Sequence, residues 1–317
     1  MAEGHRSAGE TSLTVLYPRG FWKWAALPGV LWLILLFLVP FFVLVSMAGG
    51  SLDPATGSAV PQWNPAYWDR ASFHYVFEQL LAHDGVYRVV FLRTLRYVSV
   101  AVMICLLVGY PVAYYVSRLK GRIRGVVLAL LVLPFWISYL MRMLAWVGLL
   151  NEEGLVNRIL MTVGLLQHPY PWLEGKSITV ILGLAYGYVP FLILPLFAAL
   201  DRLQNSLLEA AWDLGASSLS TFVRVTLPLS KNGILGGVAI IMLPMFGDFY
   251  TAYLLSNGRS STAMIGNSIQ SLLQETTFGY AQARGAALVT VLAVFVSFLT
   301  LYYIFSTARS TREEGRS

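Results

Sequence analysis

The chain has 317 residues, of which 57% are hydrophobic and only 12% are charged, and its mean hydropathy is +0.65. Soluble domains carry about 25% charged residues, so this composition argues against a water-soluble enzyme and excludes a disordered chain. The formal net charge of +6 does not by itself indicate nucleic acid, because basic residues of membrane proteins gather on the cytoplasmic side.

Six long apolar runs follow one another along the chain. Four carry no charge, one contains only Arg142 and one contains only Asp248. Each run supplies the roughly 20 residues that a helix needs to cross about 30 Å of hydrocarbon, and none alternates as a barrel strand does. We therefore expect an all-α membrane protein with six transmembrane helices. They are predicted within Trp24–Leu52, Tyr97–Ser117, Gly125–Asn151, Ser177–Leu200, Asn232–Gly258 and Gly285–Ala308.

The first run follows three basic residues, as the apolar core of a signal peptide would. It is far longer than the roughly 7–15 residues of such a core, so we expect a retained membrane anchor. A polar outer segment follows, and it predicts a short amphipathic helix at about Phe73–Leu81. The single cysteine, Cys105, lies in an apolar run and is expected to be a small buried hydrophobic residue.

The basic residues predict the orientation of the chain. Arg118, Lys120, Arg122 and Arg124 fill one short loop with positive charge, and such loops stay in the cytoplasm. Both termini are then cytoplasmic. The predicted segments are a cytoplasmic tail at 1–23, a first helix at 24–48, an outer loop at 49–90, a five-helix core at 91–305 with a long cytoplasmic loop at 201–231, and a cytoplasmic tail at 306–317.

Prolines and small residues mark the runs internally. Prolines remove helical hydrogen-bond donors, which suits helices that bend as a path opens, although prolines are also common in membrane helices. Gly183 and Gly187 lie four residues apart and predict a close helix contact. The prolines within the runs are Pro40, Pro111, Pro134, Pro190, Pro195 and Pro244.

The long loop at 201–231 is patterned. Ser206–Glu209 fits a capping box, and Gly215 lies where a left-handed turn would end the first short helix. A second short helix, capped by Ser217 or Ser218, is expected to stop at Leu227–Pro228. The first helix either docks in the groove of a partner or folds against the bundle, and its periodicity fits both.

Within this loop, Glu-Ala-Ala is followed by a glycine six residues after the glutamate and then by Leu-Pro. The pattern and its place between the second- and third-last spans resemble the EAA loop of ABC-type import permeases. In that family the short helix inserts into a cytoplasmic ATPase subunit, so the resemblance implies ATPase coupling by this segment. The residues assigned to coupling are Glu209, Ala210, Ala211, Asp213, Gly215, Leu227 and Pro228.

Two further stretches, Leu133–Leu150 and Leu243–Leu255, resemble the spermidine/putrescine branch of these permeases. The resemblance implies a type I ABC importer permease in a prokaryotic cell membrane. It implies pairing with a second permease, as a heterodimer, with two ABC ATPase subunits that hold ATP and magnesium, and with an extracytoplasmic binding protein. The substrate it implies is a polyamine or a related small cation, and members of the branch also carry other solutes.

Arg142 and Asp248 are the charges inside the predicted spans, and such charges mark function. Both lie on helices that enter from the cytoplasmic side, so at about 1.5 Å per residue they are expected about 25 Å up, at nearly the same depth in the outer half of the membrane. Asp248 then either lines the substrate path, pairs with Arg142, or lies hydrated near the outer interface. Nearby aromatic residues suit cation–π contacts or interface anchoring. The candidate path residues are Trp136, Tyr139, Arg142, Trp146, Asp248 and Tyr250.

Several motifs are missing from the sequence. It contains no P-loop pattern and no His-Glu-x-x-His, and its four histidines are scattered, so we expect no catalysis, cofactor or metal in this chain and no nucleic-acid partner. A membrane enzyme would show clustered polar residues at one membrane face. A secondary transporter driven by an ion gradient would show several intramembrane carboxylates or an inverted repeat, and neither is visible.

Overall fold

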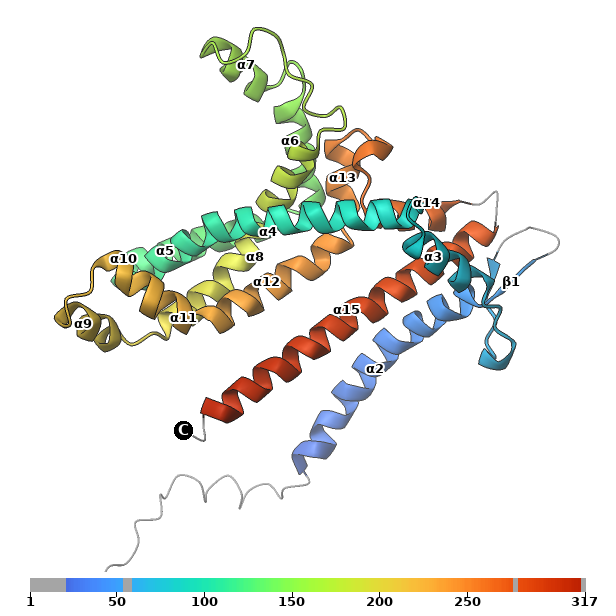
Figure 1. Cartoon of the computed structure of the whole chain (residues 1–317), viewed down its shortest axis with the longest axis horizontal. Helices are drawn as coiled ribbons and strands as arrows, with labels where there is room; N and C mark the ends of the chain where they lie inside the picture. Colours follow the sequence, from blue (N-terminus) through green and yellow to red (C-terminus); the bar gives the residue numbers. More distant parts are fainter. Residues whose placement is uncertain (1–20, 54–58, 276–278, 315–317) are drawn as a thin grey trace, which may run out of the picture.

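The computed structural model describes residues 21–53, 59–275 and 279–314, and these residues form mostly helices (Figure 1). Some of the long helices run along the longest axis of the molecule, the first and last helices run obliquely to it, and the segment from Tyr139 to Thr162 extends sideways. The prediction of an all-α protein is confirmed, apart from one two-stranded hairpin of two residues per strand.

The N-terminal part contains α2 (Phe21–Ala48), β1 (Ser51–Leu52), β2 (Ala59–Val60), the 3-10 turn η1 (Pro65–Tyr67) and α3 (Ala71–Leu81). The predicted amphipathic helix is therefore present as α3. The antiparallel hairpin and α3 lie at the opposite end of the molecule from α9 (Figure 1). The outer loop expected at 49–90 thus has secondary structure of its own.

The central bundle consists of α4 (Val86–Arg118), α8 (Ser177–Asp201) and α12 (Lys231–Phe246), which pack on one another. A Cβ added at Gly233 would lie 2.2 Å from Ala199 Cβ, so α12 and α8 touch where the side chain is missing. Cys105 is fully buried between α4 and α8, as expected, and its thiol donates to the carbonyl of Ala185 at 3.4 Å.

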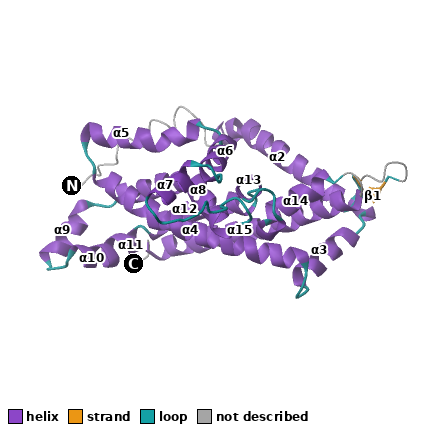
Figure 2. Cartoon of the chain, turned by 90° about the horizontal axis from the view of Figure 1, so that it is seen from above, coloured by secondary structure: helices purple, strands orange, loops and turns teal. Residues whose placement is uncertain are grey.

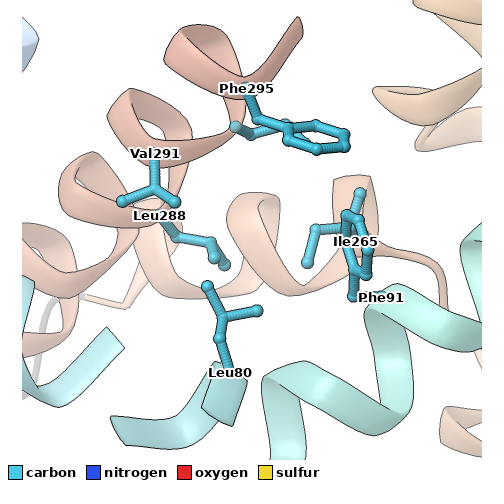
Figure 3. A pocket seen from close by; sticks show the side chains of 7 residues that line it. Leu80, Phe91, Ile265, Leu288, Val291 and Phe295 are labelled. Atoms are coloured by element: carbon cyan, nitrogen blue, oxygen red, sulfur yellow. The ribbon is translucent and has the colours of Figure 1, made fainter. Parts of the chain in front are cut away.

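The final helices complete the fold outside this bundle. After η4 (Ser260–Thr262), α14 (Ile265–Gln274) packs on α15 (Gly279–Glu314), and α15 also contacts α2, beside which it runs in Figure 1. Figure 2 shows the same helices from above. An apolar cavity of about 250 Å³ separates α15 from α4 (Figure 3). Its side chains come from α3, α4, α14 and α15 and offer no polar partner to a charged solute; they are Leu80, Phe91, Ile265, Leu288, Val291, Leu292 and Phe295.

Two of the six predicted spans are broken. The third run divides into α5 (Gly121–Val132), the 3-10 turn η2 (Leu133–Trp136) and, after a bend of 87°, α6 (Tyr139–Leu150), which leads to α7 (Leu155–Thr162). The break contains Pro134, which has no backbone donor to continue an α-helix. The fifth run divides between α12 and α13 (Tyr250–Leu255).

Among the described residues, four helices are long and apolar enough to cross a membrane, and the number is six if each bent pair counts as one span. The four are α2, α4, α8 and the first part of α15. The bent pairs are the α5–α7 segment and the segment from Ser218 to Phe246, which bends by 63°. The second pair thus joins α12 to helical turns that the sequence analysis assigns to the long loop.

The loop between α8 and α12 folds as α9 (Asn205–Asp213), α10 (Ser218–Thr221), a π-helical turn, η3 (Phe222–Thr226), and α11 (Leu227–Leu229). The predicted capping box is wrong, because α9 already begins at Asn205 and Gln204 makes no side-chain cap bond. The helical turns end at Leu229, one residue beyond the predicted stop at Leu227–Pro228. Pro228 lies in α11, which continues directly from η3.

Candidate functional site

The carboxylate of Asp248 is buried in the break between α12 and α13, with its side chain in a cage of donors. The hydroxyl of Tyr139 donates to Oδ2 at 2.6 Å, that of Thr251 at 2.9 Å and that of Tyr188 at 3.2 Å. The backbone N–H of Thr251 donates to Oδ1 at 2.9 Å. The residue is 6% exposed, so both oxygens have exchanged water for protein donors.

Three segments position these donors. Tyr139 begins α6 after the break, Tyr188 lies in α8, and Thr251 lies in the first turn of α13, which the aspartate caps. A Cβ at Gly187 would lie 2.6 Å from Cε2 of Tyr139, so the glycine admits the tyrosine ring to the surface of α8. The close helix contact predicted at Gly183 and Gly187 is present: Gly183 lies against α13 and Gly187 against α6.

Arg142 lies one turn beyond Tyr139 on α6 and is 7% exposed. Its Nη1 donates to the carbonyl of Gly187 at 3.4 Å, and its guanidinium carbon lies 5.4 Å from the centre of the Tyr139 ring. Within the described part of the chain, its Nε has no partner and no ion pair joins it to Asp248. The predicted pair is therefore not formed in this structure.

The two charges are nevertheless neighbours, because Tyr139 contacts both. The hydroxyl of this tyrosine binds Asp248 and its ring lies against Arg142. The two residues do not reach a common depth by equal rise along straight helices, since α6 follows an 87° bend. The interpretation that each charge is hydrated is also wrong here, because both side chains are buried in the chain.

The other predicted path residues lie outside this cluster. Trp136 is 82% exposed on the turn before α6. Tyr250 is about half exposed and packs against Phe249, and Trp146 packs edge-on against Tyr186 at 5.3 Å between ring centres. The structure thus groups Tyr139, Arg142 and Asp248 and leaves these three aromatic residues apart.

The second candidate site is α9, at one end of the molecule (Figure 1). Its helix ends in a Schellman motif: Ala216 N–H donates to the carbonyl of Ala211 and Gly215 N–H to that of Trp212. Gly215 has φ +81°, as predicted for a left-handed turn. Glu209 and Trp212 are exposed, whereas Leu208 is buried, so α9 presents one face outward and anchors the other.

Residues 101–311 match the family described as "Binding-protein-dependent transport system inner membrane component". The chain belongs to this family. It is 35% identical over 270 residues to "Spermidine/putrescine transport system permease protein PotB" of Haemophilus influenzae, covering 84% of this chain and 89% of that protein. It is 37% identical over 187 residues to the protein of the same name in Escherichia coli, covering 59% and 67%.

Solved structures agree with the fold of the permease. It aligns with a bacterial ABC transporter "involved in the import of the acidic polysaccharide alginate" with a TM-score of 0.56 at 18% identity, covering 91% of this chain and 99% of that chain. A complex of such a transporter with an alginate-bound periplasmic protein gives 0.59 at 21% identity, covering 90% and 95%. The chain is therefore a permease subunit of an ABC importer, a transport component rather than an enzyme.

Two members of the carboxylate cluster were not predicted. Tyr188 lies in an uncharged apolar run where a single tyrosine carries no distinctive pattern. Thr251 had a usable signal, because an aspartate three residues before a hydroxyl residue at the start of a helix is the spacing of an N-terminal cap. The matched region 101–311 contains the whole cluster and α9.

Proposed function

We propose that this permease carries a small polycation of the spermidine and putrescine class and that Asp248 attracts it. The observation that carries the proposal is a buried carboxylate with hydroxyl and amide donors around it but, among the described residues, no basic nitrogen within 4.0 Å. A buried charge without a counter-ion favours binding of a cation. The names of the relatives support the same class of solute.

The aromatic rings beside Asp248 also suit the binding of an ammonium group. The rings of Tyr139 and Tyr188 lie 5.5 Å apart between their centres, beside the carboxylate. Aromatic faces attract cations, most strongly where water is excluded. Because three of the four donors to Asp248 are hydroxyls on rotatable side chains, an entering ammonium can take their place at Oδ2 without leaving a fixed charge unpaired.

In this proposal the permease forms its path together with a second, similar permease chain. The end with α9 faces the cytoplasm, as the basic loop indicates, and α9 docks on one of two ATPase subunits that hold ATP and Mg²⁺. An extracytoplasmic binding protein delivers the solute to the opposite end, where α3 and the hairpin lie. ATP-driven closure of the ATPases then favours one of two states of the path.

The substrate proposal is tested in proteoliposomes that contain the complete transporter and its binding protein. Uptake of labelled spermidine and putrescine is compared for the unmodified permease, Asp248→Asn and Asp84→Asn. The control carboxylate is exposed, so its variant is expected to transport normally. Loss of the buried charge is expected to lower uptake by about tenfold or more, since about 1.4 kcal/mol corresponds to tenfold.

Two results would overturn the substrate proposal. One is normal polyamine uptake by Asp248→Asn. The other is an unmodified transporter that ignores polyamines and takes up a neutral or anionic solute, which would leave the family assignment intact.

The docking proposal is tested with Glu209→Lys and Gly215→Asp, with the exposed neighbour Ser206→Ala as the control. The charge reversal and the lost left-handed turn are expected to abolish uptake while the complex stays in the membrane and ATP hydrolysis becomes independent of solute. Normal uptake by both variants would contradict docking through α9.

A further inference from the structure

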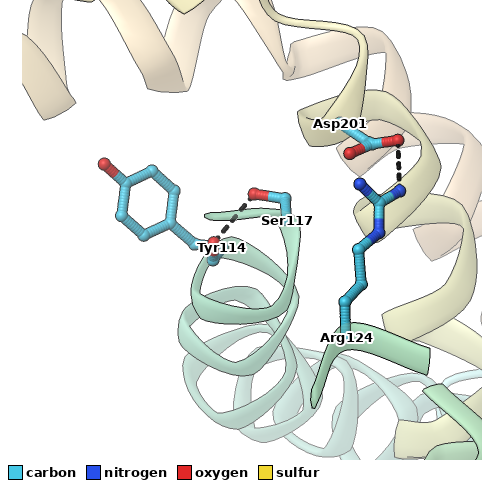
Figure 4. Close-up of polar contacts among 4 residues, drawn as sticks. All are labelled: Tyr114, Ser117, Arg124 and Asp201. Atoms are coloured by element: carbon cyan, nitrogen blue, oxygen red, sulfur yellow. Dashed lines mark hydrogen bonds and ion pairs between the residues drawn. The ribbon is translucent and has the colours of Figure 1, made fainter. Parts of the chain in front are cut away.

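Two breaks in the helical chain face each other at the α9 end of the permease. One break lies between α4, which ends at Arg118, and α5, and the other between α8, which ends at Asp201, and α9. Nη1 of Arg118 donates to Oδ1 of Asn205 at 2.8 Å. Figure 4 shows the second contact, in which Nη2 of Arg124 pairs with Oδ2 of Asp201 at 2.7 Å. We call these two contacts the double bridge.

The two contacts of the double bridge join the helices on either side of one break to the helices on either side of the other. Arg118 belongs to the last turn of α4 and Arg124 to the first turn of α5, while Asp201 ends α8 and Asn205 begins α9. A movement of α9 therefore pulls on α4 through one contact. A movement of the end of α8 pulls on α5 through the other.

Aromatic rings support both arginines. The guanidinium carbon of Arg118 lies 5.2 Å from the centre of the Tyr114 ring, and that of Arg124 lies 5.0 Å from the centre of the Phe197 ring. A planar guanidinium that stacks on a ring loses little further freedom when it binds a carboxylate or an amide. The two contacts are thus directional connections rather than diffuse charge attraction.

The other two basic residues of the loop behave differently. Lys120 and Arg122 are exposed and, within the described part of the chain, their side chains make no hydrogen bond or ion pair. Gly121 between them has φ +66°, the left-handed turn that redirects the chain into α5. All four basic residues of the loop indicate the orientation equally well. Among the described residues, Arg118 and Arg124 are the two that make a specific side-chain contact across the breaks.

We propose that the double bridge transmits the movement of α9 to α4 and α5, and that Arg118 and Arg124 are positioning residues for coupling. The inference rests on the proposed docking of an ATPase subunit on α9. The helix α5 leads through the 87° bend to Tyr139 and Arg142, so a displaced α5 moves the residues around Asp248. The link thus joins the ATPase surface to the buried carboxylate through two bridges and one helix.

The energetics make the proposal testable without unfolding the protein. The side chains of Arg124 and Asp201 are 34% and 32% exposed, and exposed ion pairs contribute little to stability, typically less than about 1 kcal/mol. Variants of the double bridge are therefore expected to fold and assemble, and their effect is expected in the coupling of hydrolysis to uptake.

The experiment uses the complete transporter in proteoliposomes and measures ATP hydrolysed per solute imported, together with the amount of assembled complex. Arg124→Ala and Arg118→Ala are expected to raise this ratio by about threefold or more while hydrolysis continues. Arg122→Ala, from the same loop, is the matched control and is expected to leave the ratio unchanged. Exchanging the charges, with Arg124→Asp and Asp201→Arg in one chain, is expected to restore a large part of the coupling.

Three results would overturn the link. The ratio stays unchanged in Arg124→Ala and Arg118→Ala, or hydrolysis and uptake fall together with the amount of complex, or Arg122→Ala raises the ratio as much as its neighbours. If Glu209→Lys uncouples the transporter while the bridge variants do not, docking on α9 stands and only the link fails. If neither Glu209→Lys nor Gly215→Asp has an effect, the docking proposal itself fails.

Discussion

At the scale of single residues, the permease keeps a carboxylate out of water by surrounding it with hydroxyls. Tyr139 is the central residue of this arrangement, because it is the donor at the shorter tyrosine distance and its ring also lies against Arg142. Tyr188 makes a longer contact of 3.2 Å. We therefore expect the hydroxyl of Tyr139 to contribute more to the stability of the permease than the hydroxyl of Tyr188.

Removing each hydroxyl tests this difference. Tyr139→Phe is expected to lower the free energy of unfolding by about 1–3 kcal/mol, because a hydrogen bond to a buried charged acceptor is lost, and Tyr188→Phe by less. Thermal unfolding of the purified permease in detergent measures both. Tyr115→Phe, on an exposed tyrosine of α4, serves as the control and should not shift the midpoint. An equal or larger effect of Tyr188→Phe would contradict the assigned roles.

At the scale of elements, missing side chains decide how closely helices approach. A Cβ added at Gly266, in α14, would lie 2.7 Å from the carbonyl oxygen of Gly247 and 2.8 Å from that of Asp248. Both oxygens belong to the backbone at the break between α12 and α13, which cannot move as a side chain end can. This glycine therefore seats α14 on the break that presents the carboxylate.

Substitution of this glycine is expected to be costly. Gly266→Ala should lower the free energy of unfolding by about 1–3 kcal/mol through overpacking and reduce uptake, since the backbone of Asp248 is displaced. Gly148→Ala is the matched control, because a Cβ there meets nothing within 4 Å inside α6. That control is expected to be neutral or to stabilise by roughly 0.5–1 kcal/mol. Equal midpoints for the two variants would refute the close contact.

Several of the long helices could be predicted from the sequence pattern alone. The apolar runs predicted α2, α4, α8 and α15, because burial or lipid exposure along a whole helix needs only length and hydrophobicity. They did not predict the breaks after Val132 and Phe246. Hydrophobicity continues through those positions, so the apolar pattern alone gives no sign of the breaks, although Pro134 lies at the first of them.

At the scale of the whole molecule, burial is unevenly divided. In α2, 6% of the most apolar 18-residue window is buried inside the chain, against 44% for α4 and 50% for α8. The stability of the single permease therefore rests on the α4–α8–α12 bundle. The outward surface of α2 is available to lipid or to another chain.

Two matched leucine-to-alanine substitutions test whether stability rests on the α4–α8–α12 bundle rather than on α2. Leu192→Ala, fully buried in α8, is expected to lower the free energy of unfolding of the isolated permease by about 2–5 kcal/mol. Leu33→Ala, 69% exposed on α2, is expected to change it by less than about 0.5 kcal/mol. The midpoints of thermal unfolding, measured in detergent, give the loss of stability for each variant. Comparable losses would mean that α2 is part of the core of the single chain.

The sequence alone determined that this is a multi-span helical membrane protein, that the first helix of its patterned loop ends at Gly215, and that Arg142 and Asp248 lie among its apolar residues. These properties depend on hydrophobicity, charge and local turns, all of which are written along the chain. Tertiary structure alone decided that Tyr139 and Tyr188 hold the carboxylate, that Arg142 stays unpaired with it, and that Arg118 and Arg124 reach the α8–α9 break. Those contacts join residues from different helices, and their geometry depends on helix breaks and glycine contacts that no local pattern specifies.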